Sequence, residues 1–272
     1  MSTGTIAPAL PDLEAVADIA RRAGAVIMAV YGRAFGVRHK DDASPLTEAD
    51  EAAEALIVPA LQALTPGWAV VAEEAVAAGQ VPSPGSHFWL VDPLDGTREF
   101  VARNGEFTVN IALVHHGAPV LGVVYAPALG TAGVLYAGQV GQGAWREAGD
   151  GPQGRLLRSS LRCRSRPARG AVLACSRSHG DEAQLQAWLR AQEPPWLDVQ
   201  REVAGSALKF GLVAEGRADV YPRLGRTMEW DTAAGHALLR AAGGEVLDLQ
   251  GRPLRYGKPG FESPHFVALG AG

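Results

Sequence analysis

The sequence predicts an α/β (α+β) protein, with helices and a run of strands in its first half and alternating strands and helices in its second. Three observations support this fold class. Apolar residues near the N-terminus recur every three or four positions, as on one face of a helix. Short segments rich in β-branched residues follow. Beyond a polar, arginine-rich segment at 146–169, strand-like and helix-like patterns alternate, which is typical of α/β proteins.

Two helices are expected first. Apolar side chains between Asp12 and Tyr31 are spaced as on an amphipathic helix. Thr47 can cap a second helix, and Asp50, three residues further on, completes a capping box. The turn-forming sequence Thr65-Pro-Gly ends this second helix.

Strands are expected next, in short apolar runs rich in β-branched residues. The expected strands are 69–72, 88–91, 107–114, 120–125 and 138–145. The glycines of the last segment suggest bulges or bends within that strand.

The second half is expected to alternate between strand and helix. The expected strands are 171–175, 196–202, 218–221 and 245–247, and the expected helices are 182–190, 206–215 and 232–242. The polar segment 146–169 is the candidate boundary between the halves. We therefore expect an N-terminal α+β half at 1–155, carrying most metal ligands, and a C-terminal α/β half at 156–272.

The composition indicates a soluble enzyme. Apolar residues make up 47% of the 272 residues and charged residues 20%, which is too apolar for a disordered chain. A net charge of −4 gives no basic surface for a nucleic-acid polymer. The N-terminus does not resemble a signal peptide, and no apolar run approaches the roughly 20 residues that cross a bilayer. A cytoplasmic protein without integral membrane association is expected.

The strongest local signal is the segment Trp89-Leu-Val-Asp-Pro-Leu-Asp-Gly-Thr97. An apolar strand runs into Asp92, and the proline after it interrupts regular pairing. Asp92 and Asp95 can converge in front of the sheet, where carboxylate oxygens suit Mg²⁺. The backbone N–H groups of Gly96 and Thr97 can meet a phosphate. The alternative is a plain Asp-Gly turn between two strands.

A second acidic signal is the pair Glu73 and Glu74, directly after the first expected strand. Adjacent acids usually lie in a solvated loop. Since the strand that ends at Asp92 is of the same kind, two neighbouring strands ending in acids would form one pocket. The sequence therefore places Glu73 near Asp92.

Asp231 gives the third signal, just before or within the first turn of an expected helix. Aspartate is a favoured helix cap, so capping alone is one interpretation. The two roles are compatible, because one carboxylate oxygen can face the backbone and the other a metal. Three acidic clusters at element ends point to phosphoryl transfer with several metal ions, two of which can lie about 3.5–4 Å apart. Neither a P-loop nor an HExxH motif competes.

These motifs resemble those of the inositol monophosphatase superfamily: an acid pair, then D-P-x-D-G-T, then W-D near the C-terminus. The chain is most similar to the bacterial 3′(2′),5′-bisphosphate nucleotidase subgroup. The similar segments are 40–50, 92–105, 106–113, 122–127, 176–179, 205–210 and 221–225. The resemblance implies a layered αβαβα sandwich of the sugar-phosphatase type.

The resemblance also implies roles for individual residues. Two or three Mg²⁺ ions would be bound by Glu73, Asp92, the backbone carbonyl of Leu94, Asp95 and Asp231. Thr97, with Glu73 or Asp50 nearby, would orient or deprotonate the attacking water, and Gly96 and Thr97 would hold the phosphate. The residues expected to contact the substrate are Leu94, Asp95, Gly96, Thr97, Ser176, His179, Ser206, Lys209, Arg223 and Asp231.

The function implied by the resemblance is hydrolysis of the 3′-phosphate of adenosine 3′,5′-bisphosphate to AMP and phosphate. Water would attack the 3′-phosphorus in line, without a phosphoenzyme. The 3′-phosphorylated sulfate donor is a candidate second substrate. Alternatives are an inositol monophosphatase, another sugar-phosphate phosphatase with the same metal site, or a non-catalytic anion-binding protein that keeps the fold. A homodimer is left open.

Overall fold

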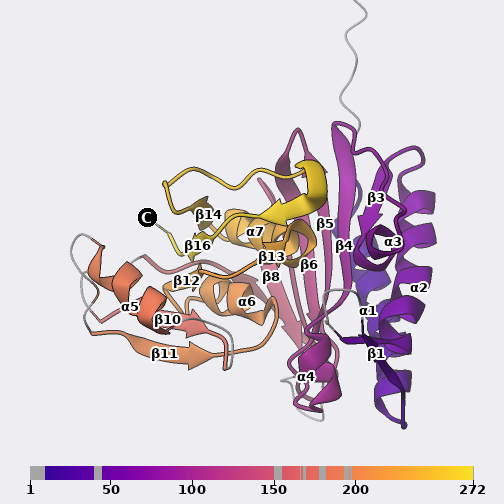
Figure 1. Cartoon of the computed structure of the whole chain (residues 1–272), viewed down its shortest axis with the longest axis horizontal. Helices are drawn as coiled ribbons and strands as arrows, with labels where there is room; N and C mark the ends of the chain where they lie inside the picture. The colour runs from indigo at the N-terminus through magenta and orange to yellow at the C-terminus, as the bar shows by residue number, and fades with distance from the viewer. Residues whose placement is uncertain are drawn as a thin grey trace, which may run out of the picture.

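The protein is described by a computed structural model covering residues 10–39, 45–149, 155–165, 167, 170–177, 182–192, 196 and 198–271. Within these ranges the chain forms five layers (Figure 1). Two long helices cover one face of a seven-stranded sheet, and a second pair of helices covers its other face. A five-stranded sheet and a further helix complete the stack. The expected αβαβα sandwich is confirmed.

The first layer contains α1 (Leu13–Tyr31) and α2 (Glu48–Leu64). The side chain of Asp12 accepts a hydrogen bond from the backbone of α1. Thr47 and Asp50 form the predicted capping box of α2. Both helices bury apolar faces against the sheet, as the spacing of their apolar residues predicts.

The seven-stranded sheet follows the order β3-β4-β5-β6-β7-β8-β9 among the described residues. Its strands are β3 (Ala69–Ala72), β4 (His87–Asp95), β5 (Thr108–His115), β6 (Ala118–Ala126), β7 (Val134–Gln139), β8 (Gly143–Ala148) and β9 (Leu157–Leu161). Only the β3–β4 pair of this sheet is parallel. Along β4, Trp89 and Val91 pack toward α1 and α2, whereas Phe88 and Leu90 face the second half. Both faces of the sheet are therefore buried.

The prediction of one strand over 138–145 was wrong. The chain instead forms β7 and β8, joined by a tight turn at 140–142. Gly141 and Gly143 have φ values of 85° and 97°, so these glycines serve a reversal of the chain rather than a bulge. The polar segment after Arg146 continues the sheet with β9, so pairing crosses residue 155. The division of the chain into two halves stays a prediction.

Two short helices, which the sequence did not predict, follow the first two strands of this sheet directly. They are α3 (Glu73–Ala77), after β3, and α4 (Thr97–Val101), after β4. A small hairpin of β1 (Val37–His39) and β2 (Pro45–Thr47) precedes α2. The chain therefore turns into α3 and α4 directly at the two acidic motifs that follow β3 and end β4.

The middle layer holds α6 (Leu208–Ala214) and α7 (Glu229–Ala241), which are buried on all sides. Close approach of α7 to the first sheet depends on glycine. A β-carbon at Gly122 would overlap the backbone carbonyl of Ala234, and one at Gly138 would meet Ala241. This contact brings the second half of the chain against the first sheet.

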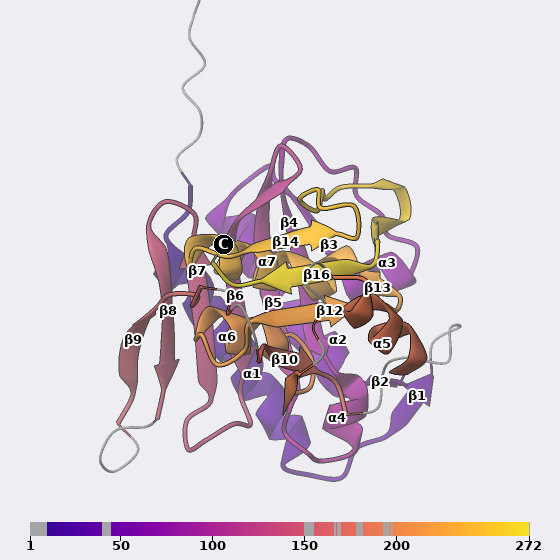
Figure 2. The ribbon, with the colours of Figure 1, turned by 90° about the vertical axis from the view of Figure 1, so that its left-hand side faces the viewer.

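The five-stranded sheet has the order β11-β10-β12-β16-β14 (Figure 2). Its strands are β10 (Val172–Cys175), β11 (Gln200–Val203), β12 (Val220–Arg223), β14 (Glu245–Asp248) and β16 (Phe266–Leu269). The outer helix α5 (Glu182–Arg190) has the predicted bounds. β13 (Thr227–Met228) pairs with β15 (Glu262–Ser263). β16 is antiparallel to both of its neighbours, so the second half is not a simple parallel α/β sheet.

Within the described part of the chain, α1 and the other helices are all too short or too polar to cross a bilayer.

Candidate active site

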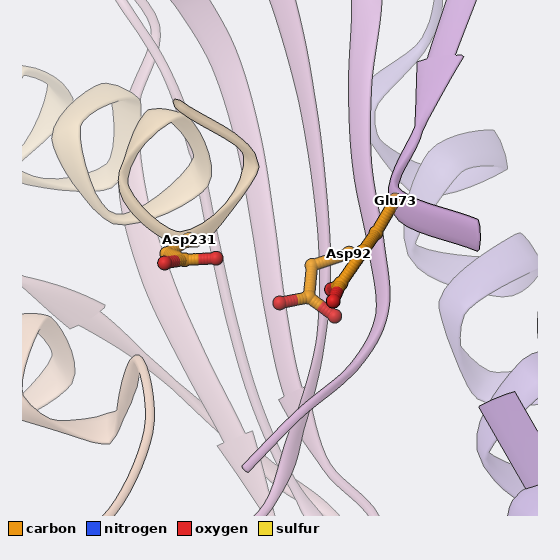
Figure 3. A group of neighbouring side chains, drawn as sticks. All are labelled: Glu73, Asp92 and Asp231. Carbon is orange, nitrogen blue, oxygen red and sulfur yellow. The ribbon is translucent and has the colours of Figure 1, made fainter. Parts of the chain in front are cut away.

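Three carboxylates from distant parts of the sequence converge between the first sheet and α7 (Figure 3). Glu73 is the first residue of α3, Asp92 lies in β4, and Asp231 lies in the first turn of α7. Ala72 pairs with Val91 in the parallel β3–β4 ladder, so the residues that follow them, Glu73 and Asp92, are neighbours. One oxygen from each carboxylate lies within 4.8 Å of the others.

Local hydrogen bonds orient two of these acids. Oδ1 of Asp92 accepts a hydrogen bond from the backbone N–H of Leu94 at 3.0 Å, where the strand register shifts. Oδ2 of Asp231 accepts one from the backbone N–H of Met228 at 2.8 Å. Asp231 therefore caps its helix, as one interpretation of its position predicted, and also belongs to the carboxylate cluster. Its role as a metal ligand stays a prediction.

Asp95 lies in the same region but outside the group of three. Its Oδ2 accepts hydrogen bonds from Asn110 Nδ2 at 3.2 Å and Thr108 Oγ1 at 3.5 Å, across the β4–β5 ladder. Burial raises the pKa of Asp95 to about 6, although the nearby Lys209 ammonium opposes the shift.

The electrostatics of the cluster favour a cation. Burial raises the pKa of Asp231 well above its ordinary value, and the negative charges of Asp95 and Glu73 add to that effect. A divalent cation would stabilise the ionised forms of these acids. Their donor atoms are all oxygens, the ligands that magnesium prefers. The residues present therefore fit magnesium.

Thr97 and Asp50 form a hydrogen-bonded pair beside the carboxylates. Thr97 Oγ1 donates to Asp50 Oδ1 at 3.1 Å and lies 3.3 Å from the carbonyl oxygen of Leu94. Oδ2 of Asp50 accepts from the backbone N–H and the hydroxyl of Thr47, at 2.8 and 2.7 Å. Asp50 is buried and held in place by the capping box of α2. Its other oxygen therefore fixes the position of the Thr97 hydroxyl.

Gly96 joins β4 to α4 in a conformation that favours glycine, with φ at 90°. A β-carbon there would overlap Ser206 Oγ. That hydroxyl lies 2.9 Å from the carbonyl oxygen of Asp95 and 2.8 Å from that of Glu106. Ser206 thus binds the loop of the first half directly, a contact that the sequence did not predict.

A cavity of about 310 Å³ contains these groups. Its walls include most of the predicted site residues: Glu73, Asp92, Leu94, Asp95, Gly96, Thr97, Ser176, Ser206, Lys209, Arg223 and Asp231. Asp50 lies behind Thr97, and His179 lies outside the described residues.

Two cations of the second half line this cavity. Lys209 is buried and donates to the carbonyl oxygens of Ser206 and Ala204, at 2.6 and 3.3 Å. Burial lowers the pKa of Lys209 to about 8, a shift that Asp95 opposes. Nε of Arg223 is buried and has no hydrogen-bond partner among the residues described. A ligand in the cavity could accept from it.

Sequence reasoning missed several residues that line the cavity: Pro45, Arg98, Glu99, Ala207, Phe210, Tyr221, Thr227, Thr232 and Phe266. Arg98 and Glu99 directly follow the Asp-Gly-Thr motif, so their position was a usable signal. Asn110, which donates to Asp95, also had a usable signal, because an amide within an apolar strand requires a partner if that strand is buried. Phe266 gave none, since its strand is separated from every motif.

The five-layer fold and its carboxylate centre define a member of the inositol monophosphatase family. Residues 11–265 match the model of that family, so the chain belongs to it.

Among individual relatives, the chain is 46% identical over 246 residues to the 3′(2′),5′-bisphosphate nucleotidase CysQ of Escherichia coli K12. That alignment covers 90% of this chain and 93% of the relative. The Haemophilus influenzae CysQ is 35% identical, and the alignment covers 95% of this chain and 92% of that relative. The crystal structure of CysQ from Bacteroides thetaiotaomicron is 37% identical with a TM-score of 0.77. The alignment covers 96% of this chain and 97% of that one. The structure of the Thermotoga maritima IMPase is 26% identical with a TM-score of 0.70, and the alignment covers 93% of this chain and 89% of that one.

Proposed function

We propose that this protein is a magnesium-dependent 3′(2′),5′-bisphosphate nucleotidase. The proposed reaction converts adenosine 3′,5′-bisphosphate to AMP and phosphate, and the 3′-phosphorylated sulfate donor is a candidate second substrate. The observation that carries the proposal is the convergence of Glu73, Asp92 and Asp231 in a cavity. Relatives that bear this nucleotidase name and are 46–47% identical over 90% of the chain support the substrate class.

In the proposed site, magnesium is held by Glu73, Asp92, Asp231, Asp95 and the carbonyl oxygen of Leu94. The number proposed is two or three ions. Bound magnesium supplies positive charge that lowers the pKa of water and offsets the charge of the phosphate. The raised pKa values of Asp95 and Asp231 support this assignment, because each carboxylate lacks sufficient compensating charge in its buried position.

The attacking water is proposed to be oriented by Thr97. Because the Thr97 hydroxyl donates its proton toward Asp50, its oxygen is left to accept a hydrogen bond from water. The water oxygen forms a bond to the 3′-phosphorus while the bond from phosphorus to O3′ breaks in line. The departing O3′ takes up a proton from solvent, and AMP leaves with a 3′-hydroxyl. Glu73 is proposed to assist Thr97 and Asp50 in taking the proton of the water.

The phosphate is proposed to rest on the backbone N–H groups of Gly96 and Thr97. These groups lie at the start of α4, where N–H groups have no acceptor within the helix. The positive φ of Gly96 turns the chain at this point, and Ser206 supports the turn from behind. The loop is therefore preorganised for an anion.

The nucleotide is proposed to extend toward the second half. Lys209 and Arg223 supply positive charge there, and Ser176 and Ser206 supply hydroxyl groups. His179 belongs to the same proposal. The free Nε of Arg223 supports an anionic group on that side of the cavity. A cytoplasmic location is part of the proposal, and the homodimer stays a prediction.

The rival function is that of an inositol monophosphatase, which the similarity to the Thermotoga maritima IMPase favours. The two functions share the carboxylate site and differ in the organic part of the substrate. The lower identity to that protein, 26%, ranks it second.

A substrate panel tests the proposal. Phosphate release is measured from adenosine 3′,5′-bisphosphate, adenosine 2′,5′-bisphosphate, AMP and inositol 1-phosphate, each with Mg²⁺ and with EDTA. We expect the highest kcat/KM for the 3′,5′-bisphosphate, no release from AMP, and loss of release in EDTA. Preference for inositol 1-phosphate would establish the rival, and release that persists in EDTA would overturn the metal assignment.

A further inference from the structure

Glu54 contacts the backbone that carries Glu73. Glu54 lies in α2, with 9% of its surface exposed. Its Oε2 accepts a hydrogen bond from the backbone N–H of Glu74, and its Oε1 accepts one from that of Ala75, each at 2.8 Å. Both oxygens of one carboxylate are therefore bound to the first turn of α3.

The short helix α3 needs such a partner. The first N–H groups of a helix have no acceptor within the helix, and a preceding side chain usually supplies one. The residue before α3 is Ala72, whose side chain has no polar atom. A helix of one turn is also marginal on its own. Glu54, from a different helix, thus provides the cap that the local sequence lacks.

The position of this cap links it to the carboxylate cluster. Glu73 directly precedes Glu74, so the bonded N–H groups fix the backbone from which the Glu73 side chain extends. Glu54 also follows Asp50 by four residues, which places both on one face of α2. Asp50 holds the hydroxyl of Thr97. One helix therefore aligns two different parts of the site through two carboxylates.

We propose that Glu54 is a positioning residue for the metal site, acting through α3 on Glu73. This inference rests on the proposed role of Glu73 as a metal ligand. A carboxylate suits the role because both of its oxygens accept hydrogen bonds. Glutamine at this position offers one acceptor and turns an NH₂ group toward the second N–H. The substitution Glu54→Gln keeps the shape of the side chain and removes this match.

Metal binding is measured by calorimetric titration of the metal-free full chain with Mn²⁺ and Mg²⁺. The variants are Glu54→Gln, Glu54→Asp and Glu73→Gln. We expect Glu54→Gln to weaken metal binding about tenfold, the usual effect of losing a group that orients a ligand. Glu54→Asp keeps the charge but draws the oxygens back, so we expect a smaller loss. Saturating Mg²⁺ should restore most of kcat, with the nucleotide KM unchanged.

Two controls separate positioning from general destabilisation. Glu51→Gln changes an exposed acid on the same helix, paired with Arg38. Ile57→Val removes a buried methylene from α2 and should lower the thermal midpoint without affecting metal affinity. In the Glu73→Gln background, adding Glu54→Gln should weaken metal binding little further, because the two residues act through one ligand.

The outcomes distinguish this inference from the function on which it rests. If Glu73→Gln loses affinity while Glu54→Gln and Glu54→Asp bind metal as the unaltered chain does, the positioning role is overturned and the metal site stands. If Glu73→Gln also binds normally, the assignment of Glu73 fails first. If Glu54→Gln and Ile57→Val lower the thermal midpoint equally and Glu54→Gln loses no more metal affinity than Ile57→Val, the positioning role is likewise overturned.

Discussion

Thr97 and Asp50 are 47 residues apart in the sequence, yet the hydroxyl of Thr97 donates to Oδ1 of Asp50 at 3.1 Å. The other oxygen of Asp50 is occupied by Thr47, whose backbone N–H and hydroxyl both donate to it. The capping box of α2 is therefore also the support of the group proposed to orient water. The carboxylate of Asp50 thus serves both the cap of α2 and the hydroxyl of Thr97.

Replacing Thr97 by valine tests this arrangement. Thr97→Val removes the hydroxyl and keeps the shape, so kcat should fall about 100-fold, within the range for loss of a group that assists proton transfer. KM should change little. Thr97→Ser keeps the hydroxyl and should retain activity within a few-fold. Steady-state kinetics on adenosine 3′,5′-bisphosphate measure both, and equal losses in the two variants contradict the role of the hydroxyl.

Neutralising either acid of β4 should abolish most turnover. Asp92→Asn and Asp95→Asn each remove a charge from the proposed metal site, and we expect kcat to fall by at least about 100-fold. Circular dichroism should show an intact fold. Asp18→Asn, an exposed acid in α1 paired with Arg22, is the matched control. Activity equal to that of the control in either variant would make the metal-site assignment wrong.

Magnesium should stabilise the folded protein. An ion that binds only the folded state at about 100 times its Kd adds about 2.7 kcal/mol to the free energy of unfolding. For a chain of this length the thermal midpoint should rise by several degrees. Differential scanning fluorimetry with Mg²⁺ and with EDTA measures the shift. Glu73→Gln should reduce it, and an equal shift in that variant argues for binding elsewhere.

The stability of the metal-free protein should depend on Asp95. Because burial raises its pKa from 3.8 to about 6, the folded state holds a proton that the unfolded state has released between these pH values. The free energy of unfolding contributed by this group is present below pH 4 and is lost as the pH rises toward 6. The loss is about 3 kcal/mol at most. Urea denaturation in EDTA at pH 4 to 7 measures how the free energy of unfolding changes with pH. Asp95→Asn should make this dependence weaker, and an unchanged dependence in the variant counts against the raised pKa of Asp95.

Local sequence patterns predicted much of this molecule. The capping residues of α2, the bounds of α5 and the position of Asp231 near the start of α7 depend on neighbouring residues only. The acidic motifs were identified for the same reason, since each lies at the start or the end of an expected strand or helix. These features did not depend on how the sheets are assembled.

Features that depend on strand pairing or on contacts between helices were not predicted. Glycine marks a bulge and a hairpin turn equally well, so the sequence did not separate β7 from β8 at Gly141. The hydrogen bond from Asn110 to Asp95 follows from the register of β4 and β5. Glu54 looks like an ordinary helical glutamate until α3 is seen against it. The contacts of Asn110 and Glu54 join segments that are distant in the sequence, whereas the hairpin at Gly141 is local and its glycines have two interpretations.

The contact of α7 with the first sheet has a consequence for how the molecule could be divided. Asp231 comes from the later part of the chain, while Glu73 and Asp92 come from the earlier part. Neither fragment of a chain cut near residue 155 would hold a complete centre. Two such fragments should be inert alone and regain hydrolysis on mixing, because reassociation would restore the packing of α7 against Gly122 and Gly138. The carboxylate centre therefore exists only where both parts of the chain meet.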